Sequence, residues 1–138
     1  VITSASLTNL LVWEKIKGFD ELLFIDGVDR DFCIRANRSG YRIIKDYDIC
    51  LLHELGNLKC RRYFGRTIYV TNHSKFRKYY MARNVIYLDK KLGLNFKFKY
   101  IFKLLLKTML YENDKIKKIK AISKGIRDGF CLASNIKD

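Results

Sequence analysis

The 138-residue sequence contains no proline, and this absence is the feature that most constrains its fold. Proline interrupts helices, so a chain without it favours long, uninterrupted helices and excludes proline-rich linkers. Hydrophobic residues make up 49% of the chain, which argues against intrinsic disorder even at a net charge of +14. The length suits one domain or part of one.

Charge divides the sequence into two unlike parts. Residues 1–56 carry 7 Lys or Arg and 9 Asp or Glu, whereas residues 57–138 carry 21 and 5. A basic surface attracts nucleic acid, anionic lipid or phosphorylated small molecules. The second part is therefore expected to face a negatively charged partner.

The sequence gives no sign of secretion or of a membrane span. Residues 1–4 lack the basic start of a signal peptide. No apolar run approaches the ~18 residues that a spanning helix needs. The four cysteines have neither CxxC nor zinc-finger spacing, so they are expected to be reduced thiols of a cytosolic protein.

Hydrophobic periodicity and capping residues predict five helices and three short strands. The predicted helices cover residues 8–17, 26–39, 74–91, 96–111 and 114–130. The predicted strands cover residues 41–44, 49–53 and 67–71. A helix followed by Gly-Tyr and two strands is an α/β arrangement, although two or three strands cannot close a sheet by themselves.

Acidic residues gather at the start of the predicted 26–39 helix, at Asp26, Asp29 and Asp31. Carboxylates there can stabilise the helix N-terminus. The same groups can act as a general base or bind a metal. His53 ends an apolar predicted strand and is either structural or a metal ligand. Spacing alone leaves these alternatives open.

The basic helices also allow two interpretations each. The basic and aromatic side chains of the 74–91 helix either cover a core or face phosphate. In the 96–111 segment, Lys99, Lys103 and Lys107 recur every four residues on a broadly apolar helix. That pattern suits a core helix with a lysine edge or a membrane interface, and the basic run at 115–124 favours the interface.

Several short motifs, in order along nearly the whole chain, resemble the C-terminal half of family 2 glycosyltransferases. The resemblance is closest to the bacterial rhamnosyltransferase-like group. The motifs are Ile2-Thr3-Ser4-Ala5-Ser6, Gly18-Phe19-Asp20-Glu21, Leu23-Phe24-Ile25-Asp26, Val28-Asp29-Arg30-Asp31-Phe32-Cys33-Ile34-Arg35, Gly40-Tyr41, His53-Glu54-Leu55-Gly56, His73-Ser74, Arg77, Tyr79-Tyr80, Arg83-Asn84 and Lys124-Gly125-Ile126-Arg127-Asp128-Gly129. Two positions depart from the family pattern, since Val28 replaces a frequent Glu and Ala5 a frequent Gly.

The resemblance implies an α/β fold. Residues 1–72 are expected to be the C-terminal, acceptor-side portion of a GT-A (Rossmann-like) catalytic domain. Residues 73–138 are expected to be a basic, mainly helical extension. The family's nucleotide-binding half, with its metal-binding Asp-x-Asp motif, has no counterpart in the sequence. The chain is therefore expected to be the C-terminal portion of an enzyme and to be inactive alone.

The resemblance also implies roles for individual residues. Asp29 matches the general base that deprotonates the acceptor hydroxyl, and Asp31 supports it. His53 matches a position that helps to hold a divalent metal, Mg or Mn. The substrate-binding residues implied by the motifs are Arg35, Arg77, Tyr80, Arg83 and Asn84.

The resulting prediction is an inverting, metal-dependent glycosyltransferase. It moves a sugar such as rhamnose from a nucleotide-sugar donor to a polysaccharide or lipid-linked acceptor. It is expected to be cytoplasmic and peripheral on the inner face of the plasma membrane, with Lys99, Lys103 and Lys107 at anionic lipid. No specific nucleic-acid partner is expected. The alternative is a non-enzymatic basic module that binds nucleic acid or anionic lipid.

Overall fold

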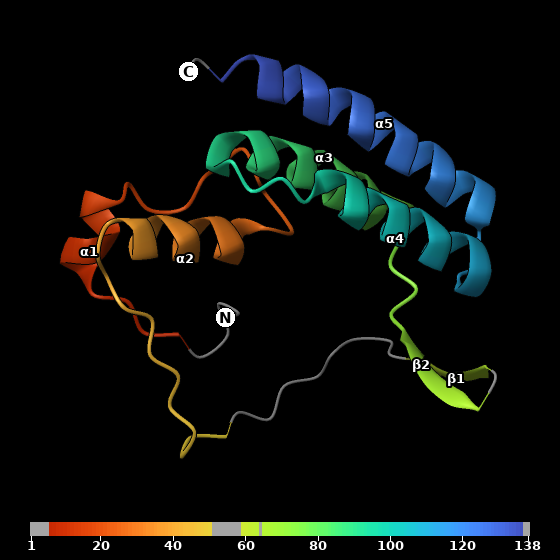
Figure 1. The fold of residues 1–138 in the computed structure, drawn as a ribbon, viewed down its shortest axis with the longest axis horizontal. Helices are drawn as coiled ribbons and strands as arrows, with labels where there is room; N and C mark the ends of the chain where they lie inside the picture. The colour runs from red at the N-terminus through yellow and green to blue at the C-terminus, as the bar shows by residue number, and fades with distance from the viewer. Residues whose placement is uncertain (1–5, 51–58, 64, 137–138) are drawn as a thin grey trace. The chain divides into compact units, whose positions relative to one another are not determined.

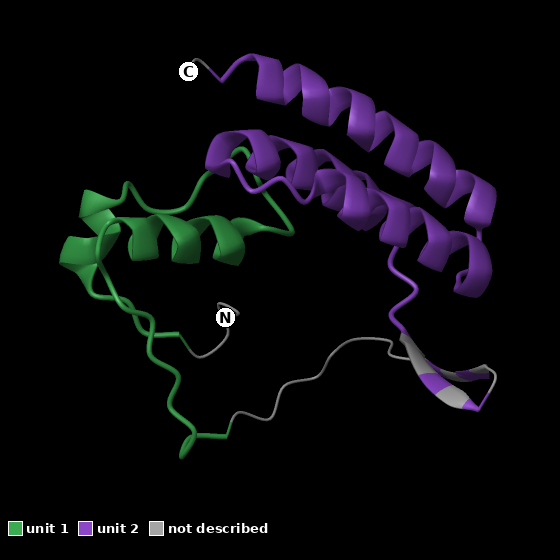
Figure 2. Cartoon of the chain, viewed as in Figure 1, with its two compact units in different colours: residues 1–52 green, residues 53–138 purple. Residues whose placement is uncertain are grey.

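The computed structural model describes residues 6–50, 59–63 and 65–136 (Figure 1). The chain divides into two compact units, residues 1–52 and residues 53–138 (Figure 2). Within the described residues, the first unit holds two helices, and the second holds a β-hairpin followed by three helices.

The first unit is organised around an aromatic cluster. Helix α1 (Leu10–Lys15) is followed by a loop and then by helix α2 (Val28–Arg38). The rings of Trp13, Phe19 and Phe32 pack with centroids 4.5 to 5.5 Å apart. Helices this short are marginal alone, so these tertiary contacts hold α1 against α2. Both helices lie where the sequence pattern predicted them, with shorter bounds.

The described residues overturn the predicted α/β fold. Residues 41–50 contain no strand, although 41–44 were predicted to form one, and most of the predicted 49–53 strand lies outside the described residues. A strand needs a neighbour to satisfy its backbone groups, and the β propensity of residues 41–44 does not provide that neighbour. The described part of the chain is helical with one hairpin, so the GT-A, Rossmann-like assignment is wrong.

The hairpin confirms one predicted strand. Strand β2 (Arg66–Val70) covers most of the predicted 67–71 strand and pairs antiparallel with β1 (Lys59–Tyr63). The register sets Cys60 opposite Tyr69. The β1 strand was not predicted because three of its five residues are basic, which weakens the strand pattern.

The three helices of the second unit also lie where the sequence predicted them. They are α3 (Lys75–Leu92), α4 (Lys97–Tyr111) and α5 (Lys115–Ser134). The Ser74 hydroxyl caps α3 by accepting a hydrogen bond from the Arg77 amide at 3.3 Å. Gly93 ends α3 with φ of 61°, a left-handed conformation that glycine adopts at little cost.

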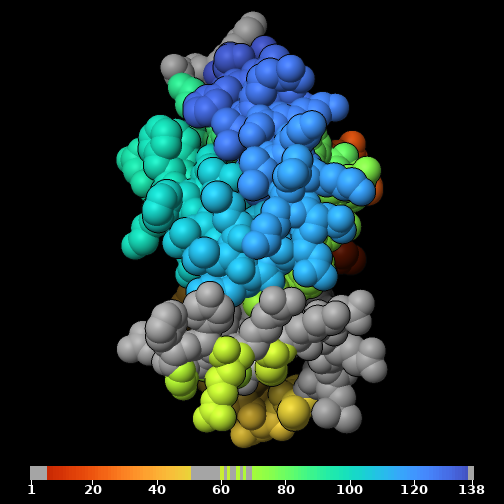
Figure 3. Space-filling view, turned by 90° about the vertical axis from the view of Figure 1, so that its right-hand side faces the viewer, coloured from red at the N-terminus to blue at the C-terminus, as the bar shows by residue number. Residues whose placement is uncertain are grey.

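One face of each of these helices contributes to the core of the second unit. Two clusters of buried apolar residues form this core: Ala82, Leu104 and Ile122 in one, and Val85, Ile86 and Ala133 in the other. Each helix supplies one residue of the first cluster. The space-filling view shows α4 (teal) and α5 (blue) side by side on the surface (Figure 3).

Two glycines allow α5 to approach α3 closely. A Cβ atom on Gly125 would lie 2.3 Å from the backbone oxygen of Tyr79. A Cβ atom on Gly129 would lie 2.7 Å from the backbone oxygen of Arg83. Backbone atoms cannot move aside as the end of a flexible side chain can, so these positions accept no side chain without displacing a helix.

Gly125→Ala is therefore expected to destabilise the second unit by about 1–3 kcal/mol, although alanine has the higher helix propensity. The measurement is the free energy of unfolding in urea, followed by circular dichroism. Ser123→Ala, at an exposed position of α5, is the control and should not lower stability. Equal stability of Gly125→Ala and the unchanged chain would contradict the close contact.

A buried ion cluster joins α3, α5 and the turn after α4. Glu112 accepts hydrogen bonds from Lys78 Nζ at 2.6 Å and from Lys118 Nζ at 3.0 Å. Lys118 also donates to Asn72 Oδ1 at 2.7 Å. Burial by itself raises the pKa of Glu112, but the hydrogen bonds and charges of the two lysines outweigh it and lower that pKa.

Asp89 on α3 caps the next helix in a similar way. Its Oδ1 accepts from the backbone amides of Phe96 at 2.6 Å and Lys97 at 3.2 Å. Its Oδ2 accepts from Lys97 Nζ at 2.5 Å. Burial raises the pKa of Asp89, but these hydrogen bonds together lower it below its ordinary value. The side chain therefore fixes where α4 begins relative to α3.

Acid should unfold the second unit as Glu112 and Asp89 become protonated. Both folded pKa values lie below the ordinary ones. Their stabilising contribution is therefore present above the ordinary values and is lost as the pH falls below about 4. The measurement is the free energy of unfolding as a function of pH.

Glu112→Gln tests the ion cluster directly. It leaves two buried lysines without their carboxylate, so it should destabilise the unit at neutral pH by about 3–5 kcal/mol. It should also flatten the acid dependence of stability. The matched control is Asp114→Asn, which removes an exposed carboxylate from the same turn. Similar effects of the two variants would contradict the assigned role of Glu112.

Candidate functional site

The acidic residues of the first unit lie at the start of α2, as the sequence predicted. Asp29 and Asp31 are in the first turn of this helix. The residue before the helix is Gly27, which provides no side-chain cap, so the two carboxylates supply negative charge at the helix N-terminus. Asp29 is half-buried. Its role as a general base is a prediction that this geometry permits but does not test.

Asp31 and Arg35 form a buried ion pair in the same helix. Asp31 is fully buried, and its Oδ2 accepts from Arg35 Nε at 2.8 Å and lies 2.7 Å from Nη2. Arg35 also donates to the backbone oxygens of Ile16 and, at 2.6 Å, of Gly18. Arg35 therefore connects α2 to the end of α1. Sequence reasoning missed this structural role when it assigned Arg35 to the substrate.

The predicted metal ligand, His53, lies outside the described residues. Within the described parts of the chain, no group of three or more His, Cys, Asp or Glu side chains is placed to hold a metal ion. The expected Mg or Mn site, with His53 as a ligand, therefore stays a prediction.

Helix α3 brings together most of the predicted substrate-binding residues. Four neighbouring side chains form what we call the α3 stack: the exposed Phe76, the half-buried Tyr80 and Arg83, and the buried Asn84. The Arg83 guanidinium carbon lies 4.5 Å from the centre of the Tyr80 ring, and Arg83 Nε donates to Asn84 Oδ1 at 2.8 Å. The Phe76 ring packs edge-on against Tyr80 at 4.9 Å. A fourth predicted residue, Arg77, is half-buried in the first turn of the same helix.

A further polar pair, Tyr79 and Asp128, adjoins the α3 stack. The Tyr79 hydroxyl donates to Asp128 Oδ2 at 2.9 Å, and the Tyr79 and Tyr80 rings pack edge-on at 5.0 Å. Arg127 donates to the other Asp128 oxygen at 3.2 Å. Burial and the bond to Asp128 raise the pKa of Tyr79, while the same bond lowers the pKa of Asp128. The pair links α5 to the stack.

Sequence reasoning did not identify the Tyr79–Asp128 pair. Both residues stood inside motifs of the resemblance, but nothing marked them as partners. The available signal was the four-residue spacing of Gly125 and Gly129, which is typical of a close helix contact. That spacing does not say which helix α5 approaches. Only the folded chain shows that it is α3.

The lysines predicted at a membrane interface lie on α4. Lys99 and Lys103 are exposed, and Lys107 is half-buried. Among the described residues, no helix is both long enough and apolar enough to span a bilayer. The role of these lysines at a membrane interface therefore stays a prediction.

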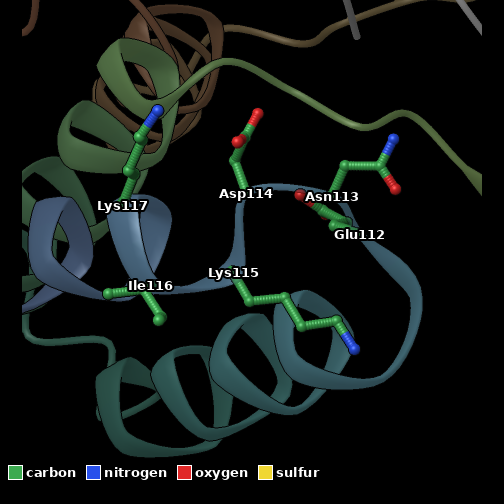
Figure 4. Close-up of a pocket in the computed structure, with 6 residues that line it drawn as sticks. All are labelled: Glu112, Asn113, Asp114, Lys115, Ile116 and Lys117. Atoms are coloured by element: carbon green, nitrogen blue, oxygen red, sulfur yellow. The ribbon is translucent and has the colours of Figure 1, made fainter.

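The turn between α4 and α5 forms a hollow lined by residues 112–117 (Figure 4). Asp114 and Lys117 extend to one side in this view, and Lys115 extends to the other. Binding sites need polar groups that converge on a ligand, and these do not. The hollow contains none of the residues predicted to act on substrate.

Comparison with known proteins supports a distant relationship. The chain is 34% identical over 90 residues to the dTDP-rhamnosyl transferase RfbF of Shigella flexneri. The match covers 65% of this chain and 29% of that protein, so the chain spans less than a third of its relative's length. No family model matches the chain, and no solved structure matches it. The similarity indicates a rhamnosyltransferase-like relationship.

Proposed function

We propose that this chain takes part in sugar transfer, as a portion of an inverting glycosyltransferase that uses a nucleotide-sugar donor. The observation that carries the proposal is the 34% identity over 90 residues with a dTDP-rhamnosyl transferase. The sugar is rhamnose and the acceptor a polysaccharide or a lipid-linked glycan. The same identity favours an enzyme over a non-enzymatic module that binds nucleic acid.

Asp29 is the proposed general base. Inversion is a single displacement at the anomeric carbon, so one base must accept the proton of the attacking hydroxyl. Of the two carboxylates in the first turn of α2, Asp31 is fully buried and bound to Arg35, whereas Asp29 is half-buried. Asp31 therefore supports the site by holding α2 in place, and Asp29 is the better candidate for proton transfer.

The α3 stack is the proposed contact for the substrate. A guanidinium group suits bidentate contacts with phosphate or carboxylate oxygens. The packing of Arg83 on Tyr80 and its bond to Asn84 orient the group before any ligand arrives. The stack is therefore suited to a diphosphate or to a negatively charged acceptor.

The proposal includes a divalent cation, and the family resemblance is its only support. When bound, such an ion neutralises the charge of the leaving nucleoside diphosphate. His53 is the residue of this chain expected to help hold it. No group of three or more His, Cys, Asp or Glu side chains gathers among the described residues, so no step of the reaction is assigned to the metal.

Asp29→Asn tests the proposed base in the enzyme that contains this chain. The amide keeps the size of the side chain but cannot accept the proton, so transfer from dTDP-rhamnose should fall by about 100-fold or more. The measurement is labelled-sugar transfer to acceptor. The control is Asp48→Asn, an exposed carboxylate in the loop after α2, which should retain full activity. Near-normal turnover by Asp29→Asn would exclude the assigned role.

Arg83→Lys tests the α3 stack in the same assay. Lysine keeps the charge but loses the planar, bidentate group, so KM should rise roughly tenfold, with a smaller change in kcat. Arg42→Lys, the same change at an exposed position in the loop after α2, is the matched control. If Arg83→Lys leaves KM unchanged, the stack does not contact the substrate.

A further inference from the structure

Helix α4 presents two parallel rows of side chains that the proposed sugar transfer does not use. The first, which we call the apolar ridge, consists of Phe98, Phe102, Leu106 and Leu110, which recur every four residues and are 45% to 74% exposed. The second, the lysine ridge, consists of Lys99 and Lys103, each one residue further along and exposed. Residues four apart on a helix lie on one face, so the two ridges run side by side.

The carboxylates of the second unit do not balance the lysine ridge. Helix α4 contains no acidic residue. Among the described residues of this unit, three of the four carboxylates make internal contacts: Asp89 with Lys97, Glu112 with Lys78 and Lys118, and Asp128 with Tyr79 and Arg127. Two of these three are buried, so they neutralise internal lysines rather than the surface. The outer face of α4 is therefore both apolar and cationic.

Helix α5 extends the positive charge beside this face. Lys115, Lys117, Lys120 and Lys124 are exposed along it. Figure 3 shows α4 and α5 next to each other on the surface. Exposed apolar residues that stand beside lysines, on a helix too short to span a bilayer, are typical of interfacial helices.

We propose that the outer face of α4 binds an anionic lipid surface. The apolar ridge enters the boundary between headgroups and acyl chains, and the lysine ridge contacts lipid phosphates. Nucleic acid fits this face less well because it offers no apolar phase to a row of exposed phenylalanines and leucines. A second copy of the chain also fits less well because pairing the two faces would bring lysine ridges together.

The test is sedimentation of the 138-residue chain with vesicles at low and high salt. Vesicles of phosphatidylcholine with phosphatidylglycerol should bind the chain, and salt should weaken binding without abolishing it, because the apolar contact is not screened. Lys99→Gln with Lys103→Gln should weaken low-salt binding about 30-fold, since each basic residue contributes about a factor of five. Phe98→Gln with Phe102→Gln should remove the salt-resistant part.

Two matched controls change the first unit instead. Lys17→Gln with Lys45→Gln removes the same charge, and Ile44→Gln with Tyr47→Gln removes exposed apolar side chains. Both should bind vesicles as the unchanged chain does, with unchanged helicity by circular dichroism. Equal losses in the controls and the α4 variants would overturn the assignment to α4.

Three further results would also overturn the proposal. One is no binding to the anionic vesicles. Another is vesicle binding that high salt abolishes and that the Phe98→Gln, Phe102→Gln variant retains in full. Such binding would be purely electrostatic, and RNA would bind in the same way. The third is that the chain does not bind vesicles but forms a dimer in solution, and that Phe98→Gln with Phe102→Gln dissociates this dimer. No assay of sugar transfer enters the test, so its failure would leave the proposed function standing.

Discussion

The architecture of the second unit depends on the close contact of α5 with α3 at Gly125 and Gly129. Because neither residue has a side chain, the backbone at Tyr79 and Arg83 lies directly against α5. This contact brings Asp128 within hydrogen-bond distance of Tyr79. It also sets Ile122 and Ala133 into the apolar clusters that α3 and α4 complete.

The buried polar groups of this unit favour one arrangement of its helices. Replacing a buried ion pair with apolar residues is often neutral, whereas removing one partner is costly. Glu112 between Lys78 and Lys118, and Asp89 at the start of α4, therefore disfavour other registers of the helices. Since α3 carries Lys78 and Asp89 as well as the α3 stack, the same contacts that define the core also orient the proposed substrate face.

The sequence predicted local features of the helices correctly, but it predicted the fold class wrongly. The helix start at Asp29 and the grouping of Tyr80, Arg83 and Asn84 on one helix could be predicted from the sequence, because both depend on residues close together in the chain. The α/β fold did not appear, because residues 41–44 have the composition of a strand without a partner strand in the described chain. The structural role of Arg35 was missed for a similar reason. Its hydrogen bonds to Gly18 and Ile16 join residues that are 17 and 19 positions apart in the sequence.

The sequence by itself determined the positions of the five helices, because hydrophobic periodicity, the Ser74 cap and the Gly93 stop are local signals. It also determined the basic character of the second part of the chain. Only the tertiary structure decided which groups meet. Tyr79 and Asp128 are 49 residues apart, and Lys78 and Glu112 are 34 apart. Such pairs depend on how helices pack, and packing depends on the shapes of many side chains at once rather than on any periodic pattern.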